Sequence, residues 1–296
     1  MTRGPAFATL ALVAACAGGR PGTTVSGAPT PVPSAPSAAS PPITAAPRPP
    51  EAVRYGPSAL RYVIHRRLHI QQALGDQTQS QDVGTRMFVA AAITGPADSV
   101  GYPATFVVDS MVPDSGTPAP IVESVTKVRG LVFAGRVAPR GEFVNAFSSD
   151  SATAQSVVQL IGNFRDFLPR LPAGGLSPGA AWTDTVEITQ KGTGSEVSRR
   201  AITQATAAAW EDHLGTRSVR LVGRQTYIVT GGGKNAGQPF DLLGTGTGSG
   251  VSFIAADGRY LGGEWQDSTS LMVRLPVQGL AVPVVQLTRT TVAVLP

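Results

Sequence analysis

The chain contains few of the side chains on which most enzyme and metal sites depend. Its 296 residues include one Cys and three His, and only 15% of them are charged. One Cys excludes a disulfide within the chain and a Cys-rich metal site, and three His leave little for imidazole chemistry. The formal net charge of +5 is small and dispersed, unlike the basic face of a nucleic-acid-binding domain. We therefore predict no enzymatic activity, no cofactor, no metal and no nucleic-acid partner.

Apolar runs long enough to cross a bilayer are also lacking. Near the N-terminus, residues 6–15 are mostly apolar and are interrupted by Thr9. A transmembrane helix needs about 20 apolar residues. This run of about ten therefore predicts the core of a signal peptide over residues 1–15.

The end of that segment has a recognisable pattern. Val13-Ala14-Ala15-Cys16 resembles the lipobox of bacterial lipoproteins, an aliphatic residue and two small residues before a Cys. The resemblance implies cleavage before Cys16 and lipid attachment to its sulfur and new amino group. Ala17, in place of an Asp, implies the outer membrane and a periplasmic location. The alternative is an ordinary signal peptide that a Cys follows by chance.

Residues 16–56 have the composition of a tether. Ten of the 25 prolines lie between Pro21 and Pro50, among Ala, Ser and Thr. Such a segment buries too little apolar surface to offset the entropy of ordering it. We expect an extended spacer between the membrane and a globular domain over 57–296. A proline-rich ligand for a partner protein is the alternative.

The globular part is predicted to be mainly β, as a large antiparallel meander sheet or half-barrel. From Tyr62 to Ile70 apolar and polar residues alternate, with Arg66 as an exception on the apolar side. Gly, Pro, Asp and Ser separate the further candidates. We expect strands at 62–70, 86–94, 104–112, 126–137, 142–147, 182–190, 198–209, 217–230, 250–256, 259–265, 269–275 and 283–295.

One amphipathic helix is expected between two halves of the domain, over about 151–168. Its apolar residues recur at three- and four-residue spacing, and Ser149, Asp150 or Ser151 is placed to cap it. We predict that this stripe covers a face of the sheet, against Ile64, Phe88, Phe106, Val186 and Ile188. The predicted contact residues are Val157, Ile161, Phe164 and Leu168.

The two halves, about 58–148 and 180–296, resemble each other when the chain is shifted by 114 residues. Asp98 then matches Asp212, and Gly101 matches Gly215. A segment at 141–144 likewise resembles 258–261. The repeat favours a strand for the Ala-rich segment 201–210. It leaves open whether the halves form one continuous sheet or two packed lobes.

The join between the halves carries a second resemblance. The segment 168–182 contains an LP-x-L-P … G-x-x-W string that looks like a junction in uncharacterised β-rich envelope lipoproteins. The wider plan of lipidated Cys, tether and large antiparallel sheet is similar to the LolA/LolB and LppX-like carriers. This likeness implies a groove for a lipid or another hydrophobic ligand.

Short matches to catalytic motifs do not hold up. Gly175–Gly179 fits G-x-S-x-G, but Pro178 after Ser177 has no N–H for an oxyanion hole. Ser124 and Lys127 fit S-x-x-K, but their neighbours favour a strand. His65 and His69 are too far apart on a strand to share a metal. We expect the Gly-rich segments 231–234 and 244–250 to form turns, bulges or hairpin ends.

Two functions remain. The chain is predicted to be a membrane-anchored structural or adaptor lipoprotein that docks an envelope protein. The alternative is a carrier or binder of a lipid or other hydrophobic ligand, held between the sheet and the helix at 151–168. Empty space beneath that helix favours the carrier, and a solid core with an exposed apolar patch or open sheet edge favours the adaptor.

Overall fold

The computed structural model describes residues 52–75, 77–154, 164–192, 194–235 and 237–296. Within these residues the fold is mainly β, with a few short helices. The strands are β1 (Ser58–Leu74), β2 (Gln77–Ile93), β3 (Tyr102–Pro113), β4 (Val132–Val137), β5 (Phe143–Ser148), β6 (Ala181–Gly192), β7 (Ser195–His213), β8 (Thr216–Asn235), β9 (Gln238–Ala255), β10 (Tyr260–Leu275) and β11 (Leu280–Leu295). The helices are α1 (Ala119–Thr126) and the short 3₁₀ turns η1 (Phe164–Asp166) and η2 (Pro276–Gln278).

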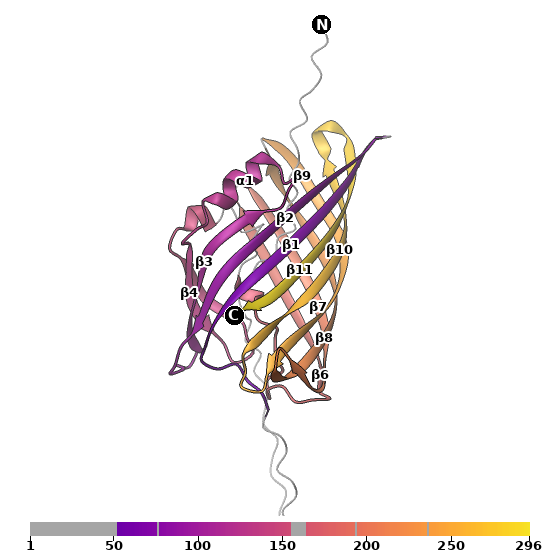
Figure 1. Cartoon of the computed structure of the whole chain (residues 1–296). Helices are drawn as coiled ribbons and strands as arrows, with labels where there is room; N and C mark the ends of the chain where they lie inside the picture. The colour runs from indigo at the N-terminus through magenta and orange to yellow at the C-terminus, as the bar shows by residue number, and fades with distance from the viewer. Residues whose placement is uncertain (1–51, 76, 155–163, 193, 236) are drawn as a thin grey trace, which may run out of the picture.

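All eleven strands belong to one antiparallel sheet, which confirms the predicted meander. Their order is β5-β4-β3-β2-β1-β11-β10-β9-β8-β7-β6. The two halves therefore form one continuous sheet, with β11 hydrogen-bonded to β1 on one side and to β10 on the other. The strands are long, tilted and twisted, and the sheet curls so that one face is concave (Figure 1).

The two halves repeat in their turns as well as in their strands. After β2, Gly101 N donates to Asp98 Oδ1 at 3.0 Å. After β7, Gly215 N donates to Asp212 Oδ1 at the same distance. The β4–β5 and β9–β10 turns also share a pattern, since the amide at 141 donates to the carbonyl at 138 and the amide at 258 to the carbonyl at 255. Equivalent hairpins thus occur in equivalent order in both halves.

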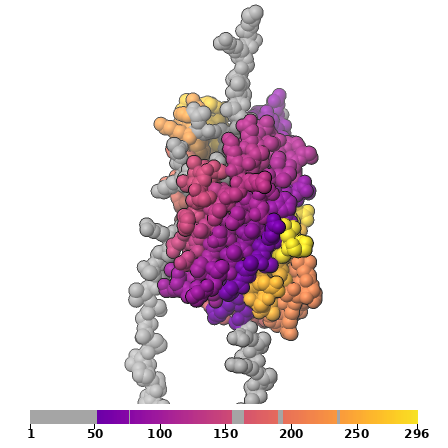
Figure 2. All heavy atoms as spheres, turned by 60° about the vertical axis from the view of Figure 1, so that its left-hand side comes forward, coloured from indigo at the N-terminus to yellow at the C-terminus, as the bar shows by residue number. Residues whose placement is uncertain are grey.

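The N-terminal half has a packed core on its concave face. Phe106 of β3 is 1% exposed, and its ring stacks on Phe164 at 4.8 Å between centroids. Phe167 contacts the rings of Phe106 and Tyr62. Figure 2 shows the closed outer surface of this half, formed by the indigo-to-magenta strands and α1. The segment that joins the halves is thus anchored on the N-terminal half.

Residues ahead of β1 pack across one end of this core. Val53 exchanges backbone hydrogen bonds with Leu176, and the Tyr55 hydroxyl donates to the Pro169 carbonyl. Both side chains are 4% exposed. The packed chain therefore includes residues that the composition of 16–56 assigns to the tether.

Three local predictions were wrong. Ser124 and Lys127 do not lie on a strand, because α1 covers 119–126 and the Ser124 hydroxyl donates to the Pro120 carbonyl within it. The segment 244–250 is not a turn but the middle of β9. Phe88 does not face the joining segment as predicted. It pairs with Val63 of β1, and this register places its side chain on the convex face, whereas Phe106 lies on the concave face.

The predicted helix at 151–168 is described only at its two ends. Residues 151–154 are helical, and Thr153 N donates to Asp150 Oδ1, so Asp150 caps this turn. Phe164–Asp166 form η1, and residues 155–163 lie outside the described part of the chain. Among the residues that the structure does describe, no helix is long and apolar enough to cross a bilayer.

Candidate functional site

The concave face of the C-terminal half lines a cavity of about 400 Å³. Strands β6–β11 and β1 form its walls, and residues 164–170 of the joining segment border it. Its lining is mostly apolar, with Ile64, Phe167, Val186, Ile188, Leu221 and Val292 among the contributors. The volume falls in the range of about 300–1,000 Å³ that is usual for small-molecule sites.

Glycines on one strand make room for side chains of the neighbouring strands on the concave face. The inward positions of β9 are Gly244, Gly246, Gly248 and Gly250. A Cβ at Gly246 would overlap the ring of Tyr227, and one at Gly250 would overlap Trp265 and the backbone of β10. Because β9 has no side chains at these positions, the rings of Tyr227 and Trp265 pack directly against its backbone.

A polar cluster crosses β7 and β8 on the same face. Arg199 Nη2 donates to Gln225 Oε1 at 2.6 Å, and Gln225 Nε2 donates to Thr203 Oγ1 at 2.8 Å. The Arg199 guanidinium lies 3.9 Å above the centre of the Tyr227 ring. The Tyr227 hydroxyl in turn bonds with Thr269 on β10. With 13% of its side chain exposed, Arg199 is thus fixed in place from several sides.

Asp267 of β10 is the carboxylate nearest to this cluster. Its Oδ1 lies 4.0 Å from Arg199 Nη2, and the side chain is 21% exposed. Burial raises the pKa of Asp267, while a hydrogen bond from Trp265 and the charges of Arg199 and Arg66 act to lower it. Its Oδ1 is buried and has no hydrogen-bond partner among the described residues. The cavity wall therefore holds a buried carboxylate oxygen that faces Arg199 without a direct hydrogen bond to it.

Arg66 of β1 completes the charged part of the wall. The register runs from Arg66 to Thr290 of β11, to Trp265 of β10 and to Gly250 of β9, so these positions lie in one row across the sheet. Asp267 lies in the next row. Arg66 is half-buried and lines the cavity. No described side chain accepts a hydrogen bond from it or forms an ion pair with it.

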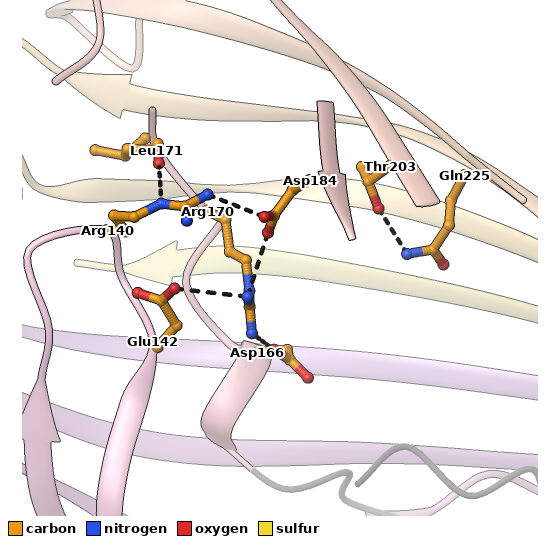
Figure 3. Close-up of polar contacts among 8 residues, drawn as sticks. All are labelled: Arg140, Glu142, Asp166, Arg170, Leu171, Asp184, Thr203 and Gln225. Atoms are coloured by element: carbon orange, nitrogen blue, oxygen red, sulfur yellow. Dashed lines mark hydrogen bonds and ion pairs between the residues drawn. The ribbon is translucent and has the colours of Figure 1, made fainter. Parts of the chain in front are cut away.

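A separate ion network stands at the rim, where the joining segment meets β6 (Figure 3). Asp184 accepts from Arg140 Nη2 at 3.1 Å and from Arg170 Nη1 at 3.2 Å. Arg170 also pairs with Glu142 at 3.5 Å and Asp166 at 3.2 Å. These contacts link β6 with the β4–β5 turn, although β5 and β6 do not hydrogen-bond to each other. Each of the five charged groups at the rim thus has an oppositely charged neighbour there.

The predicted contact residues are partly accounted for. Phe164 and Leu168 are 4% and 5% exposed, and both border the cavity together with the predicted neighbours Ile64, Val186 and Ile188. Cys16, Val157 and Ile161 lie outside the described residues. Phe164 therefore belongs both to the packed core of the N-terminal half and to the edge of the cavity.

The dismissed motifs lie away from the cavity. His65 Nε2 is 2.7 Å from Asp114 Oδ2, and His69 Nδ1 is 2.8 Å from Asp82 Oδ1, so each His has a carboxylate neighbour of its own. The carbonyl of Ser177 accepts from Ala180 N in a turn. In the described ranges, no three His, Cys, Asp or Glu side chains are grouped so that they could hold a metal ion.

Comparisons with known proteins give no family. No protein-family model matches the chain, and no curated protein sequence matches it. Among solved structures, similarity is found to OccK2 (OpdF) of Pseudomonas aeruginosa, at 9% identity and a TM-score of 0.27. Neisserial surface protein A is similar at 9% identity and a TM-score of 0.20. Each match covers 80% of this chain and 98% of the other. At these scores neither match carries an argument about this protein.

Sequence reasoning missed the charged residues Arg66 and Asp267 of the cavity wall, although a signal for each was present. Arg66 stood out as a charged residue at an apolar position of an alternating strand. Gln266-Asp267-Ser268 separates the predicted strands at 259–265 and 269–275, but β10 runs through it. Asp267 points inward there because its neighbours in sequence point outward.

Proposed function

We propose that this protein binds a small, largely apolar molecule in the cavity between the C-terminal half of the sheet and residues 164–170. The observation that supports this is the cavity itself, with its apolar walls and few convergent polar groups. The cavity borders residues 164–170, the described end of the segment predicted to cover the sheet. Space at this place favours the carrier hypothesis over the adaptor.

We further propose that the protein is a lipid-anchored component of the bacterial cell envelope, facing the periplasm from the outer membrane. The lipobox-like pattern ending at Cys16 supports this. Changing Cys16→Ser should release the mature protein from the membrane fraction, because the acyl chains attach through this residue. Retention of the variant with unchanged detergent partitioning would contradict the anchor.

An adaptor role is the second candidate, and two observations favour it. Strands β5 and β6 each have one edge at which no described residues add a further strand, and such edges accept strands from other chains. The convex face also exposes apolar side chains on β8–β11, namely Ile228, Leu243, Met272, Val285 and Leu287. Leu243 lies opposite Met272 in the register, so part of this set is contiguous.

Titration with N-phenyl-1-naphthylamine, a neutral probe that fluoresces in apolar surroundings, tests the binding function. Ala205 lines the cavity from β7, and Ala205→Leu should fill part of it and weaken saturable binding about tenfold or more. Ala209 is exposed on the same strand, and Ala209→Leu is the matched control. Equal binding by both variants, or no saturable binding by the wild type, would favour the adaptor. Chemical conversion of a bound ligand would instead indicate an enzyme.

A further inference from the structure

Three charged side chains face the middle of the cavity, and two of them are cations. Arg199 and Asp267 lie 4.0 Å apart, and Arg66 is close enough to act on the charge of Asp267. With Asp267 ionised the group carries one net positive charge, and with Asp267 protonated it carries two. In either state the group lacks a further anion that would neutralise its excess positive charge.

The other charged residues of the lining do not supply that anion. Asp166 and Asp184 are held by Arg170, and Asp184 also by Arg140. Glu264 is paired with Arg289 at 2.6 Å. Among the charged side chains that line the cavity, Arg66 is thus the one for which the described residues provide no ion pair or hydrogen bond.

A half-buried guanidinium that gains no hydrogen bond from the described residues is costly, because it has lost part of its hydration. Arg199, the other guanidinium of the group, is already engaged with Gln225 and the Tyr227 ring. An anion placed against Arg66 would restore charge-assisted hydrogen bonds and neutralise the excess charge. Its apolar body would then lie along Trp265, Leu221 and Val186, which line the same space.

We infer that the ligand is an amphiphilic monoanion whose negatively charged group, such as a carboxylate, is bound by Arg66. This inference rests on the proposed function, since it names the class of molecule that the cavity holds. Thr290 and Thr288 flank Arg66 and Asp267 in the register and offer hydroxyl groups beside the anion. A cation is disfavoured by the two guanidinium groups, and a neutral molecule leaves Arg66 unpaired.

Decanoic acid and decanol test this inference, because they have the same chain and differ in the head group. At pH 8, and below the micelle concentration of the acid, each would be titrated against protein loaded with N-phenyl-1-naphthylamine. We expect the wild type to prefer the acid over the alcohol about tenfold, the scale of one charge-assisted hydrogen bond. Arg66→Gln should abolish this preference and retain binding of the alcohol, and Arg66→Lys should restore part of it.

Arg67→Gln is the matched control, since Arg67 is the next residue of β1, faces outward and is 67% exposed. It should leave the preference unchanged, and thermal melts would establish that every variant is folded. Equal affinity of the wild type for acid and alcohol would overturn the inference but leave the proposed function standing. A preference that survives Arg66→Gln would also overturn it. Absence of saturable probe binding by the wild type would overturn both.

Discussion

Asp267 is a carboxyl group that the fold holds in an unfavourable place. It lies on a strand whose neighbour carries glycine at the facing position, Gly248, so its side chain turns across the sheet toward Arg199. Burial is the largest influence on this group, and it disfavours the charged form. Natural proteins retain such groups where function needs them, at a cost in stability.

The stability of the protein should therefore respond to Asp267 in a pH-dependent way. Folding raises the pKa of Asp267, so the folded protein favours the protonated carboxyl. The stability that this provides is fully present below the unfolded pKa of about 3.9 and is lost as pH rises through the folded pKa. Asp267→Asn should thus raise the free energy of unfolding at pH 7 by about 1–3 kcal/mol, the scale of the desolvation cost of a buried polar group that is incompletely hydrogen-bonded. The gain should shrink toward pH 4.

Urea melts at pH 4 and pH 7 measure this difference. Asp82→Asn, at an 82% exposed position on β2, serves as the control and should change stability little at either pH. A variant at 267 that is less stable than the wild type at pH 7 would mean that the attraction of Arg199 and Arg66 outweighs the cost of burial.

The inward glycines of β9 leave room for side chains of the neighbouring strands. The Tyr227 ring occupies the position where a side chain at 246 would begin. Gly246→Ala should displace this ring from Thr269 and Arg199 and cost about 1–3 kcal/mol, as overpacking of a core does. Gly174→Ala is the control, because nothing lies within 4 Å of its added Cβ. Denaturant melts of the two variants should differ clearly, and equal stabilities would contradict the packing described.

At the scale of elements, the joining segment is held by its aromatic residues. Phe164 is 4% exposed and contacts Phe106, Phe133 and Phe167. Phe164→Ala should cost about 3–5 kcal/mol in a denaturant melt, through lost burial and the cavity left behind. Phe147 on β5 is 68% exposed, so Phe147→Ala should change stability by about 0.5 kcal/mol or less. Similar losses in both variants would show that Phe164 is not part of the core.

Most strands could be predicted from the sequence, including several that line the cavity, but the first part of β9 and the middle of β10 could not. Segments such as 198–209 and 217–230 alternate in the usual way and lie within β7 and β8. In β9 the inward positions from 244 to 250 are glycines, so the sequence does not alternate between polar and apolar side chains there, and a strand is not predicted. In β10 the inward side includes Asp267, which reads as a turn residue between Gln266 and Ser268. The cavity needs these residues, and the same residues hide its strands from a search for apolar periodicity.

α1 was missed for a different reason. Its eight residues contain Val122 and Val125, which favour strands, and its N-cap, Pro118, makes no side-chain cap hydrogen bond. Contacts with β3 and the burial of Val125 stabilise the helix in place of local signals. The sequence alone does not contain that tertiary information.

At the scale of the whole molecule, the two halves should unfold together. The three Trp residues, Trp182, Trp210 and Trp265, all lie in the C-terminal half, on β6, β7 and β10. Since β11 hydrogen-bonds to both halves, Phe106→Ala in the N-terminal half should lower the denaturation midpoint that Trp fluorescence reports. It should lower the midpoint of far-UV circular dichroism equally. A fluorescence midpoint that stays unchanged would mean that the halves unfold independently.

The place of β11 also constrains how this protein is made. β11 is the last of the eleven strands in chain order, yet it occupies the middle of the sheet, between β1 and β10. Strands made early during translation pair with their neighbours as they emerge, but β1 and β10 must wait for residues beyond 280. Until then, the growing chain exposes long strand edges of the kind that cause aggregation. Among the described strands, a chain stopped before Leu280 would leave two half-sheets with four open edges, whereas the eleven strands together form one sheet with two.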